Sequence, residues 1–243
     1  MTSNYALITG GTKGIGFSVA KRLGKMGYNL LLTYSADVER ALQSRAELQK
    51  DFNVNVTVLQ ADSSERKAID IVFQHITDNG IRLDAIVFNA GITCRDCFDE
   101  MKEDDWEHVF FANVHYPVFL LRRLLGNINV GGSVIFTGSL MGVLPHAQSL
   151  SYGVTKATVH ALVKNLVKFL APRQIRVNAI APGFVDTAWH KNKPADIRES
   201  IEDKIALGRF GDPDELAGIY QLLVENTYIN GEIIIADGGY AYK

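Results

Sequence analysis

Short runs of apolar residues alternate along the chain with longer stretches in which apolar positions recur every three or four residues. A short apolar run predicts a buried strand, and the longer periodicity predicts an amphipathic helix. The predicted strands are Tyr5–Thr9, Asn29–Thr33, Val54–Leu59, Ala85–Phe88, Gly132–Thr137, Arg176–Ile180 and Ile233–Ala236. Helical stretches separate most of these strands, which is typical of a mostly parallel α/β sheet covered by helices on both faces.

The pattern predicts one domain, residues 1–243. The chain contains no internal repeat, low-complexity tract or Pro/Gly/Ser-rich linker at which it would divide. Residues 186–207 differ in composition from the rest of the chain, because they are polar, rich in Lys and Glu, and include Pro194. This segment fits a substrate lid and a plain surface helix equally well, and the pattern does not separate the two.

The composition of the chain limits the kinds of partner that we expect it to bind. The chain has 25 Lys and Arg residues against 27 Asp and Glu residues, a formal net charge of −2. It therefore lacks the basic field that attracts nucleic acid or an anionic membrane surface, and neither partner is expected. No apolar run reaches the roughly 18 residues of a membrane span, and the first residues lack the charged region of a signal peptide. We expect a cytoplasmic protein.

The two cysteines, Cys94 and Cys97, have the spacing Cys-x-x-Cys. Two cysteines exclude a disulfide framework but leave a redox pair or half of a zinc site open. The sequence offers no second ligand pair and no His-Glu-x-x-His stretch, so no metal site is expected.

Three glycines follow the first predicted strand and precede the first predicted helix. Gly10, Gly14 and Gly16 have the spacing Gly-x-x-x-Gly-x-Gly. Glycines there let the backbone turn sharply and let a phosphate approach the N–H groups of the helix N-terminus. The spacing is neither the usual dinucleotide fingerprint nor a Walker loop. Alone, it fits a phosphate site and a ligand-free tight turn equally well.

The end of the second strand bears on which dinucleotide would bind. Leu32–Ser35 carries no acidic residue. A carboxylate there would bond the ribose 2′-hydroxyl of NAD and repel the 2′-phosphate of NADP, whereas Lys13 offers that phosphate a cation. These residues favour NADP(H). Asp37 is the alternative, since its carboxylate would favour NAD if the strand ran further.

Several segments together resemble the classical short-chain dehydrogenase/reductases. They are Thr9–Gly16, Asn89–Gly91, Ser139, Tyr152 with Lys156, and Asn178–Gly183. The match runs from Leu7 to Gly239, in family order, with 152 − 139 = 13 residues from Ser139 to Tyr152. The resemblance implies a single-domain, Rossmann-like, doubly wound parallel sheet.

Within that family the chain is most similar to β-ketoacyl-[acyl-carrier-protein] reductases and acetoacetyl-CoA reductases. The segments that carry this likeness are Asn89–Thr93, Met101, Asp105–Trp106, Arg209–Gly211 and Asp237–Gly239. The resemblance implies NADPH-dependent reduction of a β-ketoacyl thioester in fatty-acid biosynthesis or a related pathway. It also implies a homo-oligomer, usually a tetramer.

The residue types themselves fit ketone reduction. A tyrosine hydroxyl, with a pKa near 10, becomes a better proton-transfer group when a cationic lysine lies one helical turn away. Tyr152 and Lys156 have that spacing on the helix predicted for Leu150–Leu170. Ser139 follows a predicted strand at its carboxyl end, where its hydroxyl can donate to the substrate oxygen. No Gly-x-Ser-x-Gly elbow surrounds Ser139, which argues against a hydrolase.

The resemblance adds a fourth catalytic residue, Asn113, which would hold a water that connects the lysine to solvent. Pro117 lies four residues later and has no N–H, so we expect the Asn113 carbonyl to lose its helical partner and to be free for that water.

Cofactor contacts also follow from the resemblance. Asp62 would accept from the adenine amine, Asn89 would brace the sheet, and Val185 with Thr187 would contact the nicotinamide carboxamide. The full predicted set is Gly10, Thr12, Lys13, Gly14, Ile15, Gly16, Tyr34, Ser35, Asp62, Ser63, Asn89, Ala90, Gly91, Tyr152, Lys156, Pro182, Gly183, Val185 and Thr187.

The chain departs from the carrier-protein reductases where basic residues would meet the acidic carrier. Arg173 matches one such position, but residues 127–133 carry no positive charge, and Cys94 stands where an Arg is common. Arg122 and Arg123 are candidate substitutes. Weaker steering of an acidic carrier leaves an acyl carrier protein, a CoA thioester or a free ketone open as the substrate form. A protein that binds the dinucleotide without turnover is the alternative from another class.

Overall fold

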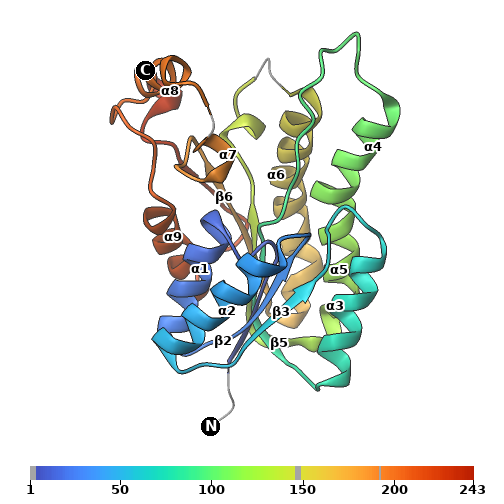
Figure 1. Ribbon diagram of the computed structural model, residues 1–243. Coiled ribbons are helices and arrows are strands. Elements are labelled where there is room, and N and C mark those ends of the chain that lie inside the picture. Colours follow the sequence, from blue (N-terminus) through green and yellow to red (C-terminus); the bar gives the residue numbers. More distant parts are fainter. Residues whose placement is uncertain (1–3, 146–148, 192) are drawn as a thin grey trace.

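A single seven-stranded sheet forms the centre of the protein, shown in Figure 1 as a computed structural model that describes residues 4–145, 149–191 and 193–243. The strands are β1 (Tyr5–Ile8), β2 (Asn29–Tyr34), β3 (Val56–Gln60), β4 (Leu83–Phe88), β5 (Ile128–Thr137), β6 (Arg176–Pro182) and β7 (Ile233–Ala236). Their order across the sheet is β3-β2-β1-β4-β5-β6-β7, and every neighbouring pair is parallel. The predicted α/β fold, a single-domain doubly wound parallel sheet, is confirmed.

Helices connect the strands and cover both faces of the sheet. They are α1 (Gly14–Lys25), α2 (Val38–Phe52), α3 (Lys67–Asp78), α4 (Glu103–Phe110), α5 (Tyr116–Leu124), α6 (Leu150–Leu170), α7 (Ala188–Lys191), α8 (Ala195–Glu202) and α9 (Pro213–Glu225). A π-helical turn, η1 (Phe111–His115), joins α4 to α5, and a 3₁₀ turn, η3 (Leu140–Gly142), follows β5. Within the described ranges, no helix is long and apolar enough to cross a membrane.

Alternation along the strands explains the two layers. Leu7 and Ile86 point into a core that α3, α5 and α6 cover. Ile8 and Val87, one position further along the same two strands, point into a second core that α1, α2 and α9 cover. Successive strand residues face opposite sides, so a strand buried on both faces must be apolar throughout. That is why the strands were visible as short uninterrupted apolar runs.

Strand β5 begins earlier than predicted. The pattern placed its start at Gly132, but pairing with β4 already begins at Ile128. Its register then shifts, because Leu83 pairs with Ile128 whereas Ala85 pairs with Ser133. Two glycines lie in this irregular part, and Gly131 has φ 84°, so the apolar run is interrupted although the pairing continues.

The topology brings the sequence motifs together. The chain winds outward from β1 to β3 and then returns to place β4 on the other side of β1. Ligands in open parallel sheets bind at the carboxyl edge near such a reversal. The segments after β1, β4, β5 and β6 carry the glycine loop, Asn89–Gly91, Ser139 and Gly183, and they meet at this edge (Figure 1).

Candidate active site

A cavity of about 470 Å³ opens at the carboxyl edge of the sheet. All but one of the predicted cofactor-binding residues line it, and the exception is Gly16. Further lining residues that the sequence did not single out are Thr33, Ala61, Ser64, Ile92, His108, Thr137, Gly138, Ala188, Trp189 and His190. Ser139, Tyr152 and Lys156 also line the cavity, whereas Asn113 does not.

Two glycines shape the loop between β1 and α1. Gly10 has φ 62°, a left-handed conformation that residues with a side chain rarely adopt. Gly16 lies behind the loop, where a Cβ would come within 2.3 Å of the Gly10 carbonyl oxygen. Gly16 therefore permits close packing of α1 against the loop, and it does not line the cavity.

Side chains from neighbouring strands hold this loop in place. Thr9 Oγ1 accepts from the main-chain N–H groups of Asn89 and Ala90 at 3.0 Å each. The Asn89 side-chain amide donates to the carbonyls of Thr9 and Gly10. Thr33, at the end of β2, accepts from the N–H of Gly10 through its hydroxyl. The bracing role that the resemblance implied for Asn89 is thus visible as hydrogen bonds.

The N-terminus of α1 fits a bound anion. Its N-cap residue, Lys13, makes no side-chain capping bond, and the first turn contains no acidic residue. The first N–H groups of a helix need an outside acceptor, and the helix dipole favours a negative one. The glycine loop, the uncapped helix and the lining of the cavity therefore fit the pyrophosphate of a dinucleotide.

The residues near the expected adenosine end are partly occupied by local bonds. Asp37, the alternative that would favour NAD, caps α2 by accepting from the N–H of Arg40. Asp62 Oδ1 accepts from the N–H and the hydroxyl of Ser64, so it also forms the turn after β3. Lys13 is exposed at the cavity. Lys13 therefore offers a cation at the cavity, whereas the Asp37 carboxylate already serves as the cap of α2.

Tyr152 and Lys156 lie on one face of α6, as their spacing predicts. The Lys156 Nζ lies 5.4 Å from the Tyr152 ring centroid and donates to the Thr137 carbonyl at 2.6 Å. Burial lowers the pKa of Lys156 to about 8. Burial also raises the pKa of Tyr152, and a hydrogen bond from Ser139 partly opposes that rise.

These directions differ from the sequence expectation, in which Lys156 makes the phenol acidic. The reason is that both groups are removed from water, which disfavours the charged form of each. In addition, the lysine directs a hydrogen bond to a main-chain carbonyl rather than to the phenol. Ser139 is the side chain that lowers the pKa of Tyr152 here.

Asn113 does not line the cavity, and its side chain links the segment after β4 to α6. Its side-chain amide donates to the Ile92 carbonyl and to Thr155 Oγ1 at 3.0 Å each, and its Oδ1 accepts from the Ile92 N–H. The residue lies in the π-helical turn η1, just before Pro117. A proline that removes one N–H is a common cause of such a distortion. The water that Asn113 would hold stays a prediction.

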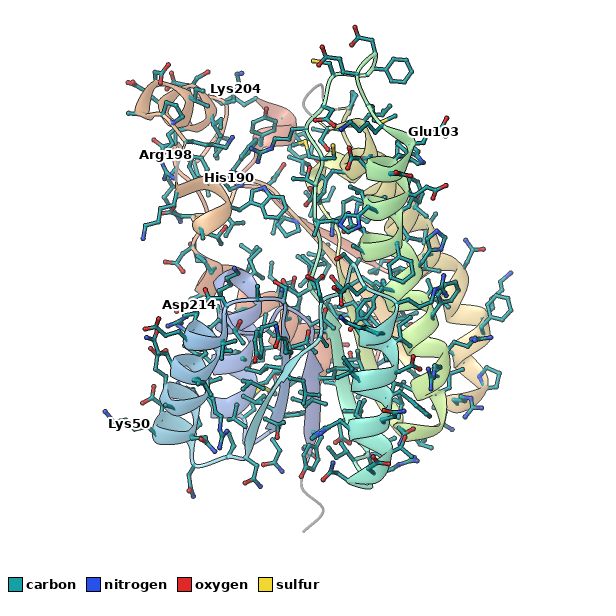
Figure 2. All side chains as sticks on the ribbon, turned by 45° about the vertical axis from the view of Figure 1, so that its right-hand side comes forward. Lys50, Glu103, His190, Arg198, Lys204 and Asp214 are labelled. Atoms are coloured by element: carbon teal, nitrogen blue, oxygen red, sulfur yellow. The ribbon has the colours of Figure 1, made fainter. Side chains whose placement is uncertain are left out.

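The polar segment 186–207 lies above the carboxyl edge and contributes to the cavity. Thr187, Trp189 and His190 line it, and the Trp189 and Tyr152 ring centroids are 6.0 Å apart. Figure 2 shows His190 and Arg198 in this segment, across from α4 with Glu103. Arg198 pairs with Asp186 and lies over Phe210, which anchors the segment. A lid function stays a prediction, but the position over the cavity is the one it requires.

Several residues important to this geometry were not found from sequence. Thr33 holds the glycine loop, Thr155 holds Asn113, and Thr137 accepts from Lys156. Each lies within or close to a segment that the sequence singled out, but a threonine at the end of a strand or within a helix is too common to indicate a role. Their partners are distant in sequence and become neighbours only in the fold.

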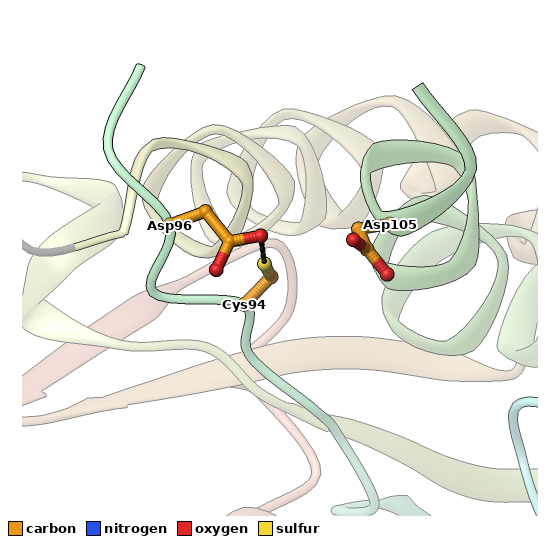
Figure 3. A group of neighbouring side chains, drawn as sticks. All are labelled: Cys94, Asp96 and Asp105. Atoms are coloured by element: carbon orange, nitrogen blue, oxygen red, sulfur yellow. Dashed lines mark hydrogen bonds between the residues drawn. The ribbon is translucent and has the colours of Figure 1, made fainter. Parts of the chain in front are cut away.

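The Cys-x-x-Cys segment forms a small cluster outside the cavity. Cys94 Sγ donates to Asp96 Oδ2 at 3.1 Å, and Asp105 lies nearby (Figure 3). A bond with the Asp96 backbone lowers the pKa of the Cys94 thiol, but the side-chain bond to Asp96, burial and the nearby carboxylates raise it overall. The Cys94, Asp96 and Asp105 side chains each offer one ligand atom, and these atoms lie within 4.8 Å of one another. Exposed acidic groups are common without a metal ion, so the expectation that no metal binds stays a prediction.

Comparisons with known proteins find relatives that match nearly the whole chain. A family model described as enoyl-(acyl carrier protein) reductase matches residues 10–241. An uncharacterised oxidoreductase, YmfI of Bacillus subtilis, is 35% identical over 240 residues, which cover 97% of this chain and 98% of that protein. The 3-oxoacyl-[acyl-carrier-protein] reductase FabG of Aquifex aeolicus is 31% identical over 243 residues, which cover 98% of both chains.

A solved structure extends the comparison to the arrangement of the fold. L-sorbose reductase from Gluconobacter frateurii, complexed with NADPH and L-sorbose, superposes with a TM-score of 0.90 at 27% identity. The match covers 100% of this chain and 98% of that one. Together with the cavity, the glycine loop and the Tyr152–Lys156 helix, these matches lead to one conclusion: the chain belongs to the short-chain dehydrogenase/reductase family of oxidoreductases.

Proposed function

We propose that the protein reduces the ketone of a β-ketoacyl thioester to the β-hydroxyacyl product with NADPH. The observation that carries this proposal is the meeting of Ser139, Tyr152 and Lys156 with the glycine loop around one cavity. When bound, NADPH supplies the hydride that adds to the carbonyl carbon, leaving NADP⁺. Tyr152 donates its proton to the carbonyl oxygen, so that the product is a neutral alcohol.

The other side chains have distinct tasks in this proposal. The Ser139 hydroxyl donates to the substrate oxygen as charge develops on it. Lys156 has a pKa of about 8 and is therefore mainly cationic at pH 7, which stabilises the phenolate that remains after proton transfer. Asn113 keeps Ile92 and Thr155 in register beside them.

NADP(H) is the proposed cofactor because of the charges at the cavity. Lys13 is exposed there, and Asp37 already accepts from the N–H of Arg40. The complex of L-sorbose reductase with NADPH supports the same choice. A lysine in this place attracts a 2′-phosphate, which NAD lacks.

An acyl-carrier-protein thioester is the first candidate substrate, since FabG relatives bear that name. A CoA thioester or another ketone is the second, and a specific observation favours it. Arg123, a candidate for docking the acidic carrier, pairs with Asp70 and lies over the Phe73 ring. Of the candidate basic residues, Arg122 and Arg173 then remain to attract the acidic carrier protein. The electrostatic attraction from two cations is weak, so it would steer the carrier poorly.

The decisive experiment follows NADPH oxidation with matched substrates. The panel contains a β-ketoacyl group on acyl carrier protein, the same group on CoA, and a free ketone. We expect turnover with a thioester. The ratio of the kcat/KM values for the two thioesters identifies the carrier. A Tyr152→Phe variant should bind NADPH but lose about 10²-fold or more in turnover. Binding of NADPH without oxidation by any substrate would instead support the dinucleotide-sensing alternative.

Assembly into a homotetramer is part of the same proposal. Leu150, Val154 and Phe169 on α6 are exposed apolar side chains, and Tyr242 near the C-terminus is also exposed. Exposed apolar side chains of this kind are common at subunit contacts. Light scattering coupled to size exclusion would give the mass directly, and a monomeric mass would overturn this part.

A further inference from the structure

A buried histidine lies beneath the turn that carries Ser139. His160 is on α6, four residues after Lys156 and eight after Tyr152, so the three side chains share one face of the helix. It is 9% exposed and is not among the residues that line the cavity. The proposed reaction therefore gives it no direct task.

The imidazole ring fills the space between two glycines that flank Ser139. A Cβ on Gly138 would lie 2.2 Å from His160 Nε2, and a Cβ on Gly142 would lie 2.9 Å from its Cε1. Separations this short show that the ring is in close contact with the main chain on both sides of the turn. A side chain at position 138 would have to push the ring away, whereas one at position 142 would also meet the α6 main chain at Lys156 and Ala157, 2.6 and 2.7 Å from its Cβ.

Hydrogen bonds fix the remaining sides of the turn. The N–H of Gly138 donates to the Ile180 carbonyl at 2.7 Å, which ties the turn to β6. The N–H of Met141 donates to Ser139 Oγ, and that of Gly142 donates to the Ser139 carbonyl. His160 has a hydrogen bond with the Gly142 backbone. The turn is thus held by β6 on one side and by α6 on the other.

The other ring nitrogen of His160 has no hydrogen-bond partner among the described residues. Burial lowers the pKa of the imidazole to about 4, and the nearby Lys156 acts in the same direction. The ring is therefore neutral at pH 7, and Nε2 faces the Gly138 main chain without a proton donor. A residue that only filled space would not need to bring an unsatisfied nitrogen into the core, because leaving one there costs free energy.

We propose that His160 is a positioning residue that holds the turn Gly138–Gly142 against α6 and thereby sets Ser139 relative to Tyr152. This inference rests on the proposed function, because it gives Ser139 its role in ketone reduction. It concerns the chain's own packing, however, and so it can be measured with or without turnover.

The test compares His160→Leu with Val163→Ala, a matched control. Leu fills most of the space but cannot bond to Gly142. Val163 lies on the same helix and is fully buried in the sheet-facing core, away from the turn. Hydrogen–deuterium exchange of the peptide that contains Met141 and Gly142 is the first measurement, because the amides of both residues bond to Ser139.

We expect His160→Leu to speed exchange in this peptide about tenfold, whereas Val163→Ala leaves it unchanged. With a ketone that the wild type reduces, His160→Leu should lower kcat about tenfold or more, because small displacements of a catalytic group are costly. The Kd for NADPH should stay within twofold. Val163→Ala should lower the thermal midpoint but not kcat.

Unchanged exchange at Met141 and Gly142 in His160→Leu would overturn the inference, whatever the turnover. Parallel loss of kcat and of NADPH binding would also overturn it, since that result indicates general damage to the fold. If His160→Leu does not fold, His160→Met, which also lacks a donor for Gly142, takes its place with the same two outcomes. Faster exchange in a protein that reduces no ketone would support the positioning role and contradict the proposed function.

Discussion

The ammonium group of Lys156 is bonded to the carbonyl of Thr137 at 2.6 Å and not to the phenol of Tyr152. The contact joins α6 to the end of β5, two residues before Ser139. It therefore couples the helix that carries Tyr152, the proposed proton donor, to the end of the strand that precedes Ser139, the group proposed to stabilise the oxyanion. The lysine is 4% exposed, so this bond also satisfies a cation that has lost its hydration.

Burial of Lys156 predicts a specific pH dependence of stability. Its pKa falls from 10.5 to about 8 on folding. Between these two pH values the unfolded chain binds more protons than the folded protein. The free energy of unfolding of the wild type therefore rises with pH in this range. The penalty for the buried cation is present in full below pH 8 and disappears above about pH 10.5.

Lys156→Met removes this group. The free energy of unfolding of the variant minus that of the wild type should therefore be larger at pH 7 than at pH 10, by a few kcal/mol at most. Urea unfolding at the two pH values measures the change. Lys164→Met, at an exposed position of the same helix, should show no such change. A Lys156→Met difference that stays constant with pH would show that the lysine is not desolvated.

Thr155 is predicted to support Asn113. Its hydroxyl is fully buried, accepts from Asn113 Nδ2 at 3.0 Å and donates to the Tyr152 carbonyl at 2.9 Å. Thr155→Val should destabilise the fold by about 1–3 kcal/mol, because it leaves buried polar groups without a partner. It should also lower kcat about tenfold through displacement of Asn113.

The matched control for Thr155 is Thr158→Val, which loses only a bond to the Val154 carbonyl within the helix. Urea unfolding and steady-state kinetics of the two variants separate the roles. Equal effects of both substitutions would mean that Asn113 does not depend on Thr155.

Lys13 is predicted to select the cofactor. Lys13→Ala removes the cation at the cavity and should raise the Kd of NADPH about tenfold, the loss of one charged hydrogen bond. The Kd of NADH should change little, since NADH has no 2′-phosphate. Fluorescence titration gives both constants, and Lys25→Ala at the far end of α1 is the control. Equal weakening of the two cofactors would contradict selection by Lys13.

Trp189 is predicted to contribute to substrate binding. Its ring packs against Tyr152 with a centroid separation of 6.0 Å and lines the cavity. Trp189→Ala should raise KM for the ketone by between about two- and tenfold, the range for loss of one aromatic contact. NADPH affinity should stay unchanged. Tyr228→Ala, at a residue that is 98% exposed, should leave both constants alone. An unchanged KM in Trp189→Ala would argue that the segment 186–207 is not a substrate lid.

The layout of the fold was predictable because its signals are local. Apolar strands such as Asn29–Thr33 must be buried on both faces, and they are readable without knowledge of their neighbours. The helix Leu150–Leu170 was predicted with its observed bounds, and its spacing correctly placed Tyr152 and Lys156 on one face. The start of β5 was not predictable, because its glycines resemble a turn unless the pairing with β4 is known.

Most of the cavity lining was also predictable, since its motifs follow strands whose carboxyl ends meet at one edge. Gly16 shows the limit of this reasoning, because the sequence groups it with the ligand-facing glycines whereas the structure uses it for packing against Gly10. Asp37 is a second case, since only the observed bond to Arg40 shows that it caps a helix.

The sequence by itself determined which residues occur at strand ends and which share a helix face, because both follow from fixed backbone periods. Only the tertiary structure decided what lies opposite each face. Thr137 opposite Lys156 and Gly138 opposite His160 are separated from their partners by many residues. The pKa directions of Tyr152 and Lys156 belong to the same class, since loss of hydration depends on every segment that packs around a group and not on its own helix.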